Sequence, residues 1–251
     1  MTKSIVGTFL ISGLLLAQTT DVKPRAPKTK KEAEVLDTVF KAPDAASRIT
    51  AVDTFLSQFA DTQFKALALY IATVSAEEAG NWEKTVIYGD RALEADPKSY
   101  GTMLVLARGY ASHTREFDLD KEEKLGKTDK YAKASLELLK AAPKLQPQIP
   151  DDQWAAQVQG FISEAHEAMG LAATIRKKYD ESITHFQAAL VATPGNANLL
   201  TRIAQANFDA KKYDEAVKSA EVVLALPNLH PTVKNIADSI KQRATAAKAN
   251  K

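Results

Sequence analysis

The feature that most constrains the fold is a five-residue segment that occurs twice. Lys-Lys-Tyr-Asp-Glu stands at 177–181 and again at 211–215, so the copies are 34 residues apart (211 − 177 = 34) in a chain of 251. Such a coincidence indicates a repeated structural unit. A period of this length suits two amphipathic helices joined by a tight turn, because one such pair must bury its apolar side against a neighbour.

The residues around each copy follow that scheme. In 163–196, apolar and small residues recur at helical spacing before the lysine pair. Asp180 and Glu181 come directly after it, where carboxylates favour the first turn of a second helix. Pro194 then ends that helix, and 197–230 repeats the pattern. The sequence therefore predicts two consecutive helical hairpins whose turns contain the lysine pairs.

These units resemble tetratricopeptide repeats (TPRs), in which large, small and aromatic residues stand at fixed positions before a final proline. The residues that carry the resemblance are Met169, Gly170, Tyr179, Phe186, Ala189 and Pro194 in one copy and Ile203, Ala204, Tyr213, Ala216, Leu224 and Pro227 in the next. A third copy at 66–99 matches at Gly80, Asn81, Trp82, Ala92, Asp96 and Pro97. It departs at Thr85 and Gly89, so we expect its second helix to pack less tightly.

Two ranges do not follow the period directly. Residues 100–146 fit one repeat with an insertion, in which Asp120 begins a long second helix. An N-cap at Asp151 or Asp152 would extend the first helix of the 163–196 repeat backward to 151.

Flanking helices are expected at 44–64 and, as a cap, at 231–247. The resemblance implies an all-α fold, a right-handed α-solenoid of about four TPR-like helical hairpins with flanking and capping helices.

The chain begins like an exported bacterial protein. Lys3 precedes a run without charge, Ile5 to Ala17, which as a helix would be about 20 Å long and thus shorter than the roughly 30 Å hydrocarbon core of a membrane. Residues 1–19 are therefore predicted to be a signal peptide, with an uncleaved anchor as the alternative. Residues 20–43, rich in Lys and Pro, are predicted to be a flexible linker to a repeat domain at 44–251.

Composition excludes several functional classes. A formal charge of +2 does not indicate nucleic-acid binding, and the absence of cysteine removes disulfides, thiolate metal sites and cysteine nucleophiles. The four histidines lack the helical spacing of a metal pair, and no nucleotide-binding or hydrolase motif occurs. We expect no cofactor, no metal, no small-molecule substrate and no catalysis. A hydrolase using Asp118 and Asp120 remains as a minor alternative.

The resemblance implies a groove lined by the first helix of each repeat, which would bind a peptide or a partner protein. The candidate contact residues are Leu67, Tyr70, Val74, Arg108, Glu164, Glu167, Leu171, Thr174, Asn198, Thr201, Gln205 and Phe208. Tyr70, Leu171 and Phe208 are expected to be its apolar anchors. The expected function is that of a protein-interaction scaffold in the periplasm or secreted. The alternative is a membrane-tethered component of an envelope assembly or transport complex.

Overall fold

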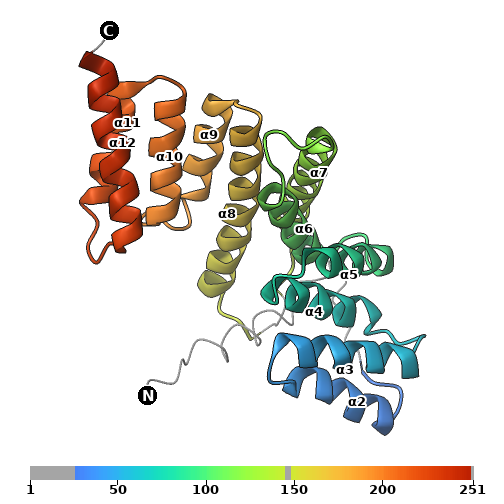
Figure 1. Cartoon of the computed structure of the whole chain (residues 1–251). Coiled ribbons are helices and arrows are strands. Elements are labelled where there is room, and N and C mark those ends of the chain that lie inside the picture. The colour runs from blue at the N-terminus through green and yellow to red at the C-terminus, as the bar shows by residue number, and fades with distance from the viewer. Residues whose placement is uncertain (1–25, 145–147, 250–251) are drawn as a thin grey trace. The chain divides into compact units, whose positions relative to one another are not determined.

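The structure, a computed structural model, describes residues 26–144 and 148–249, which form eleven helices and no strand (Figure 1). An all-α fold was predicted and is confirmed. The helices are α2 (Lys30–Lys41), α3 (Ala45–Gln58), α4 (Lys65–Glu78), α5 (Trp82–Ala95), α6 (Tyr100–Ser112), α7 (Lys121–Leu139), α8 (Asp151–Ile175), α9 (Tyr179–Ala189), α10 (Ala197–Asp209), α11 (Tyr213–Leu224) and α12 (Pro231–Ala249).

The predicted signal peptide, 1–19, lies outside the described residues. Within them, no helix combines the length and the apolar composition that crossing a bilayer requires.

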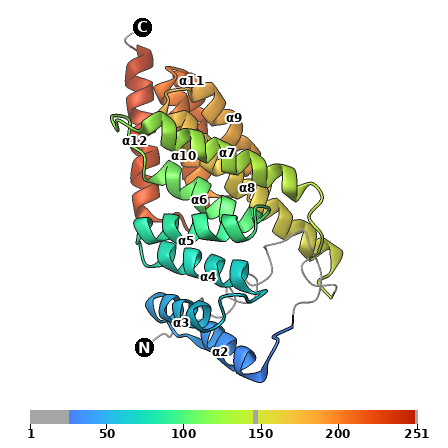
Figure 2. The same cartoon turned by 90° about the vertical axis from the view of Figure 1, so that its right-hand side faces the viewer.

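The chain divides into two compact units, each with its own core. The first unit contains residues 26–109, 133–144 and 148–154, and the second contains 110–132 and 155–249. In the first, α2 to α5 stack in chain order (Figures 1 and 2) and bury Phe55 and Leu69 completely. In the second, α12 packs against α10 and α11, and Ile240 is buried there with alanines of both helices.

The predicted flexible linker is wrong for residues 30–41, which form α2. Thr29 caps this helix, because its hydroxyl accepts the backbone N–H of Glu32 at 3.0 Å. The Glu32 carboxylate in turn accepts the backbone N–H of Lys28 at 2.6 Å, an exchange similar to a capping box. Leu36 and Val39 then join the core of the first unit. The lysines made this segment look like a linker, although Thr-Lys-Lys-Glu followed by spaced apolar residues is a helix signal.

Three hairpins share one turn conformation, and in two of them the turn contains the repeated lysines. Gly80, Lys177 and Lys211 occupy equivalent positions after α4, α8 and α10, with φ angles of 69°, 61° and 61°. In each turn the next residue donates its N–H to the carbonyl five residues back, at 2.9 Å. This left-handed ending is a Schellman motif, which satisfies the last carbonyls of the first helix. The predicted lysine-pair turns are thus confirmed.

Glycines allow the paired helices to approach closely. A Cβ atom on Gly170 of α8 would lie 2.5 Å from the ring of Phe186 on α9, and one on Gly89 of α5 would lie 2.7 Å from Leu106 on α6. Thr85 is also fully buried. The expectation that α5 packs loosely because of Thr85 and Gly89 is therefore wrong, since small residues at these positions bring the neighbouring helix closer.

Candidate functional site

In the first unit, the first-helix residues that were predicted to contact a partner are buried or make contacts within the chain. Tyr70 is only 5% exposed, so it is not available as an apolar anchor and this prediction is wrong. Arg108 forms two hydrogen bonds with Glu77, at 3.0 and 2.7 Å. Leu67 and Val74 are half-buried, and Leu67 packs on the core. The period of the repeat placed these residues on the correct helices but did not show how deeply each side chain is buried.

The predicted anchors of the second unit are half-buried and contribute to its internal packing. Leu171 packs on the cluster that contains Phe186 and Leu199. The guanidinium of Arg243, from α12, lies 4.2 Å from the centre of the Phe208 ring, a distance suited to a cation–π contact. The terminal helix therefore covers part of the surface on which Phe208 was expected to bind a partner.

The polar candidates of the second unit are more accessible. Glu167 pairs with Arg202 at 3.6 Å, and the Gln205 amide donates to Asp209 at 2.8 Å. The other candidates, half-buried except for the exposed Asn198, are Glu164, Thr174, Asn198 and Thr201. The first-helix face of this unit thus presents polar and charged groups, with little exposed apolar surface.

The structure shows a second candidate surface, which was not predicted from the sequence. The loop 113–120, between α6 and α7, contains Phe117 and Leu119, which are 88% and 107% exposed. They are the most exposed of the large hydrophobic residues in the part of the chain that the structure describes. The signal in the sequence is Phe-Asp-Leu-Asp, in which acidic neighbours make burial of the two apolar side chains unfavourable. We call residues 113–120 the insertion loop.

The insertion loop is ordered by its own hydrogen bonds. Asp118 accepts the backbone N–H of Arg115 at 3.0 Å, and its own N–H donates to the Arg115 carbonyl at 3.2 Å. The hydrogen bond from Arg115 is the main reason that the pKa of Asp118 lies below its ordinary value, with Lys124 contributing. Thr114 donates its hydroxyl to the Tyr110 carbonyl at 2.7 Å. Phe117 and Leu119 therefore project from a folded loop.

Ion pairs hold the insertion loop and the start of α7 against the turn after α8. Lys177 lies 2.6 Å from Glu116 in the loop. Arg176, only 15% exposed in its side chain, lies 2.9 Å from Glu122 and 2.8 Å from Asp129 on α7. Because Arg176 is largely shielded from water, its bonds are stronger than those of an exposed pair. Lys177 and Arg176, which directly follow the long helix α8, thus connect the end of that helix to the insertion loop and to α7.

Asp118 and Asp120, the carboxylates of the hydrolase alternative, share one cation. Their carboxylates both contact the ammonium of Lys124, at 3.4 and 2.9 Å. Asp118 orders the insertion loop, and Asp120 directly precedes α7, whose first turn also contains Glu122 and Glu123. These contacts account for both aspartates as structural groups.

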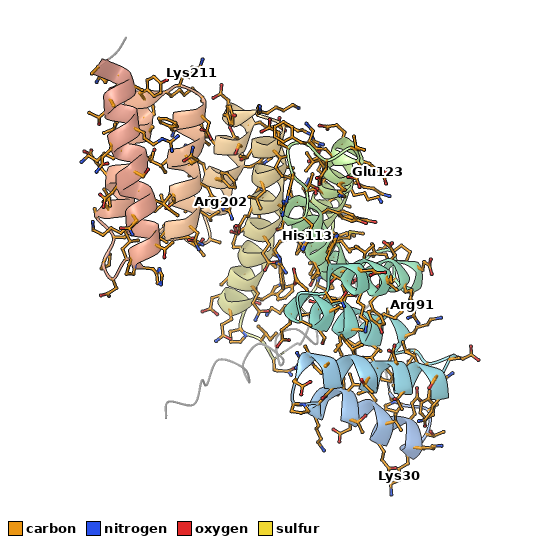
Figure 3. All side chains as sticks on the ribbon, viewed as in Figure 1. Lys30, Arg91, His113, Glu123, Arg202 and Lys211 are labelled. Carbon is orange, nitrogen blue, oxygen red and sulfur yellow. The ribbon has the colours of Figure 1, made fainter. Side chains whose placement is uncertain are left out.

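A cleft of about 610 Å³ lies between α9, α10 and α11. Ile183 and Ile203 form its apolar lining, and the Lys212 ammonium pairs with Asp180 at 2.6 Å within it. Charges of both signs line the cleft, so it does not favour an anion over a cation. Figure 3 labels Lys211, which lies at the turn between α10 and α11 next to this cleft.

Comparisons with known proteins identify the fold. No protein-family model and no curated protein sequence matches the chain. Among solved structures, the assembly chaperone of RpL4 (Acl4, residues 1–338) is similar with a TM-score of 0.60 at 14% identity, over 87% of this chain and 88% of that one. MamA from Desulfovibrio magneticus RS-1, from residue 41 to its end, has a TM-score of 0.51 at 15% identity, over 84% and 97%.

A further crystal structure of MamA has a TM-score of 0.53 at 15% identity, over 78% of this chain and 91% of that one. At such identities the likeness concerns the fold alone. Together with the shared turns, it agrees with the predicted α-solenoid of TPR-like hairpins.

Proposed function

We propose that this chain is a non-catalytic protein-interaction scaffold whose insertion loop inserts Phe117 and Leu119 into a partner protein. The observation that carries the proposal is that two large apolar side chains, 88% and 107% exposed, are held by an ordered loop. Likeness to a protein described as an assembly chaperone of RpL4 is in keeping with a protein partner.

Order in the loop makes such a contact favourable. Burying an exposed Phe or Leu side chain contributes roughly 1.5–3 kcal/mol. That gain is reduced when a loop must first be ordered, and here the bonds of Asp118 have already ordered it. The two side chains resemble the small group of central residues that dominates the energy of many interfaces.

The charges around the two side chains suggest the chemistry of the partner. Between 115 and 124 the chain has five acidic residues (Glu116, Asp118, Asp120, Glu122 and Glu123) and three basic ones (Arg115, Lys121 and Lys124), a net charge of −2 (3 − 5). Arg176 and Lys177, which pair with Glu122 and Glu116, offset this charge. Exposed apolar side chains on a surface without excess charge favour an apolar pocket on a protein. The polar first-helix face of α8 and α10 would add contacts to an extended peptide.

The test is a binding measurement with matched variants of the full chain. A partner captured from an envelope extract is purified and titrated calorimetrically with the wild type, with Phe117→Ser/Leu119→Ser, and with Ile87→Ser/Val191→Ser, which removes two exposed apolar residues elsewhere. We expect at least a tenfold loss of affinity for the loop variant alone. Equal affinity of the loop variant and the wild type would contradict the proposal.

We also propose that the protein is exported to the periplasm or secreted, on the basis of the uncharged run in 1–19. N-terminal sequencing of the protein from cells tests this, since a mature chain that begins near residue 20 is expected. An intact Met1 in the membrane fraction would favour the alternative, a tethered component of an envelope assembly or transport complex.

A further inference from the structure

Two histidines that lie 19 residues apart in sequence meet across one hairpin. His166 belongs to α8 and His185 to α9, and their Nδ1 atoms are 3.1 Å apart. The ring centres are 5.4 Å apart with an angle of 32° between the planes, and both side chains are half-buried. Two histidines contributed by different helices do not have the spacing of three or four residues that marks a metal pair on one helix, so the sequence alone does not indicate this contact.

The backbone on both sides of this pair is held in place. The Ser163 hydroxyl donates to the Ala189 carbonyl at 2.8 Å, one turn from each histidine. On the other side, Gly170 and Phe186 bring α8 and α9 so close that a Cβ atom would not fit between them. The two imidazoles are thus positioned by a packed hairpin, which lowers the entropic cost of a ligand that needs both.

The tautomers of the two rings decide whether the pair can hold a metal ion. Neutral imidazole is the form that coordinates metals, since it offers a nitrogen lone pair. Binding of a metal ion through both Nδ1 atoms requires each neutral ring to carry its hydrogen on Nε2, so that both Nδ1 lone pairs are available to the ion.

The distance between the nitrogens suits zinc. Zinc binds imidazole nitrogen at about 2.0–2.1 Å, so two ligand nitrogens of one zinc ion are about 3.1 Å apart at an N–Zn–N angle of about 98° and about 3.3 Å apart at the tetrahedral angle. The observed 3.1 Å is within a few tenths of an ångström of this geometry. We propose that His166 and His185 form a two-histidine site that binds one Zn²⁺ ion through both Nδ1 atoms.

Zinc bound in this way would bridge α8 and α9, with water in its remaining positions. Within residues 26–144 and 148–249, no group of three or more His, Cys, Asp or Glu side chains is arranged to hold a metal ion. The protein therefore supplies two ligands, and the affinity is lower than that of a structural four-ligand site. Open positions of this kind also allow a side chain of another molecule to complete the coordination.

The experiment titrates ZnCl₂ into the full chain, expressed without a histidine tag, by isothermal titration calorimetry at pH 7.5. The variants are His166→Gln and His185→Gln, and the matched controls are His113→Gln and His230→Gln, which change the other two histidines. Circular dichroism of each variant verifies that the helices are retained. Thermal unfolding with and without ZnCl₂ provides a second measurement, because a ligand that binds the folded state raises Tm.

We expect one Zn²⁺ to bind per wild-type chain with Kd below about 100 µM. The affinity for Zn²⁺ should fall at least tenfold in either His166→Gln or His185→Gln and should not change in the controls. Tm should rise with ZnCl₂ in the wild type and in the controls only. The proposal is overturned if the titration of the wild type shows no binding with a Kd below about 100 µM. It is equally overturned if binding survives in both His166→Gln and His185→Gln, or is lost in a control.

Discussion

The two helix connections at 113–120 and 210–212, both in the second unit, reverse the chain between consecutive helices in different ways. The short one reverses the chain with backbone hydrogen bonds alone, through the left-handed φ of Lys211. The insertion loop is longer, and a side chain, that of Asp118, makes the bonds that order it. The first arrangement preserves the period of the repeat, whereas the second interrupts the period and can project side chains into solvent.

The difference also changes what an apolar residue does. Leu199, in α10, is 1% exposed and packs with Phe186 and Ile203. Leu119, in the insertion loop, is 107% exposed. Both are leucines in one unit, so composition does not distinguish the residue that stabilises the fold from the residue that we propose contacts a partner.

The largest expected effect is the difference in the free energy of unfolding between substitutions of these two leucines. Leu199→Ala removes buried methyl groups and leaves a cavity, so the free energy of unfolding should fall by about 2–5 kcal/mol. Leu119→Ala should change it by less than about 0.5 kcal/mol, because the side chain makes few contacts within the chain. Urea denaturation followed by circular dichroism measures both, and similar losses would show that the insertion loop packs on the fold.

The next effect concerns the close approach of helices in the regular hairpins. Gly170→Ala places a Cβ atom 2.5 Å from Phe186, which is 1% exposed and cannot move aside easily, so we expect a loss of about 1–3 kcal/mol. Gly160→Ala, on the same helix with nothing within 4 Å of the added atom, is the control and should stabilise by roughly 0.5–1 kcal/mol. A stable Gly170→Ala protein would contradict the packing described above.

A smaller effect tests the shared turn. Lys211→Gly should stabilise the chain by about 1 kcal/mol, because glycine adopts the left-handed region without the steric cost that lysine incurs. Gly80→Ala should destabilise it by a similar amount, about 1 kcal/mol, although nothing lies within 4 Å of the added Cβ. The two variants thus change the same backbone position in opposite directions. If Lys211→Gly destabilised the chain, the turn could not be a Schellman ending of the kind described.

The smallest effect is the response of the insertion loop to pH. The pKa of Asp118 is lowered in the folded state, so its contribution is fully present above its unfolded pKa and is lost as pH falls through the lower, folded value. We expect the Arg115 amide to keep its NMR shift down to about pH 4 and to move only below it. In Asp118→Asn, the acid-induced movement should be absent. An Arg115 shift that moves near pH 5 in the wild type would contradict the assigned role of Asp118.

Regular parts of the fold could be predicted because their signals are local. The helix bounds around 177 and 211 follow from periodicity, capping carboxylates and breakers, all within a few residues. The Thr29–Glu32 cap is also a local signal for helix α2, although the charged composition of the same segment is typical of a linker. The burial of Tyr70 and the cover of Phe208 by Arg243 depend on helices distant in sequence, so periodicity alone does not indicate them.

The sequence by itself determined that residues 163–230 form two hairpins 34 residues apart, because helix propensity and turn chemistry act between near neighbours. Only the tertiary structure decided which side chains remain available. It buried Tyr70, exposed Phe117 and Leu119, and brought His166 to His185, since burial and contact depend on how the helices pack against one another and not on the spacing along one helix.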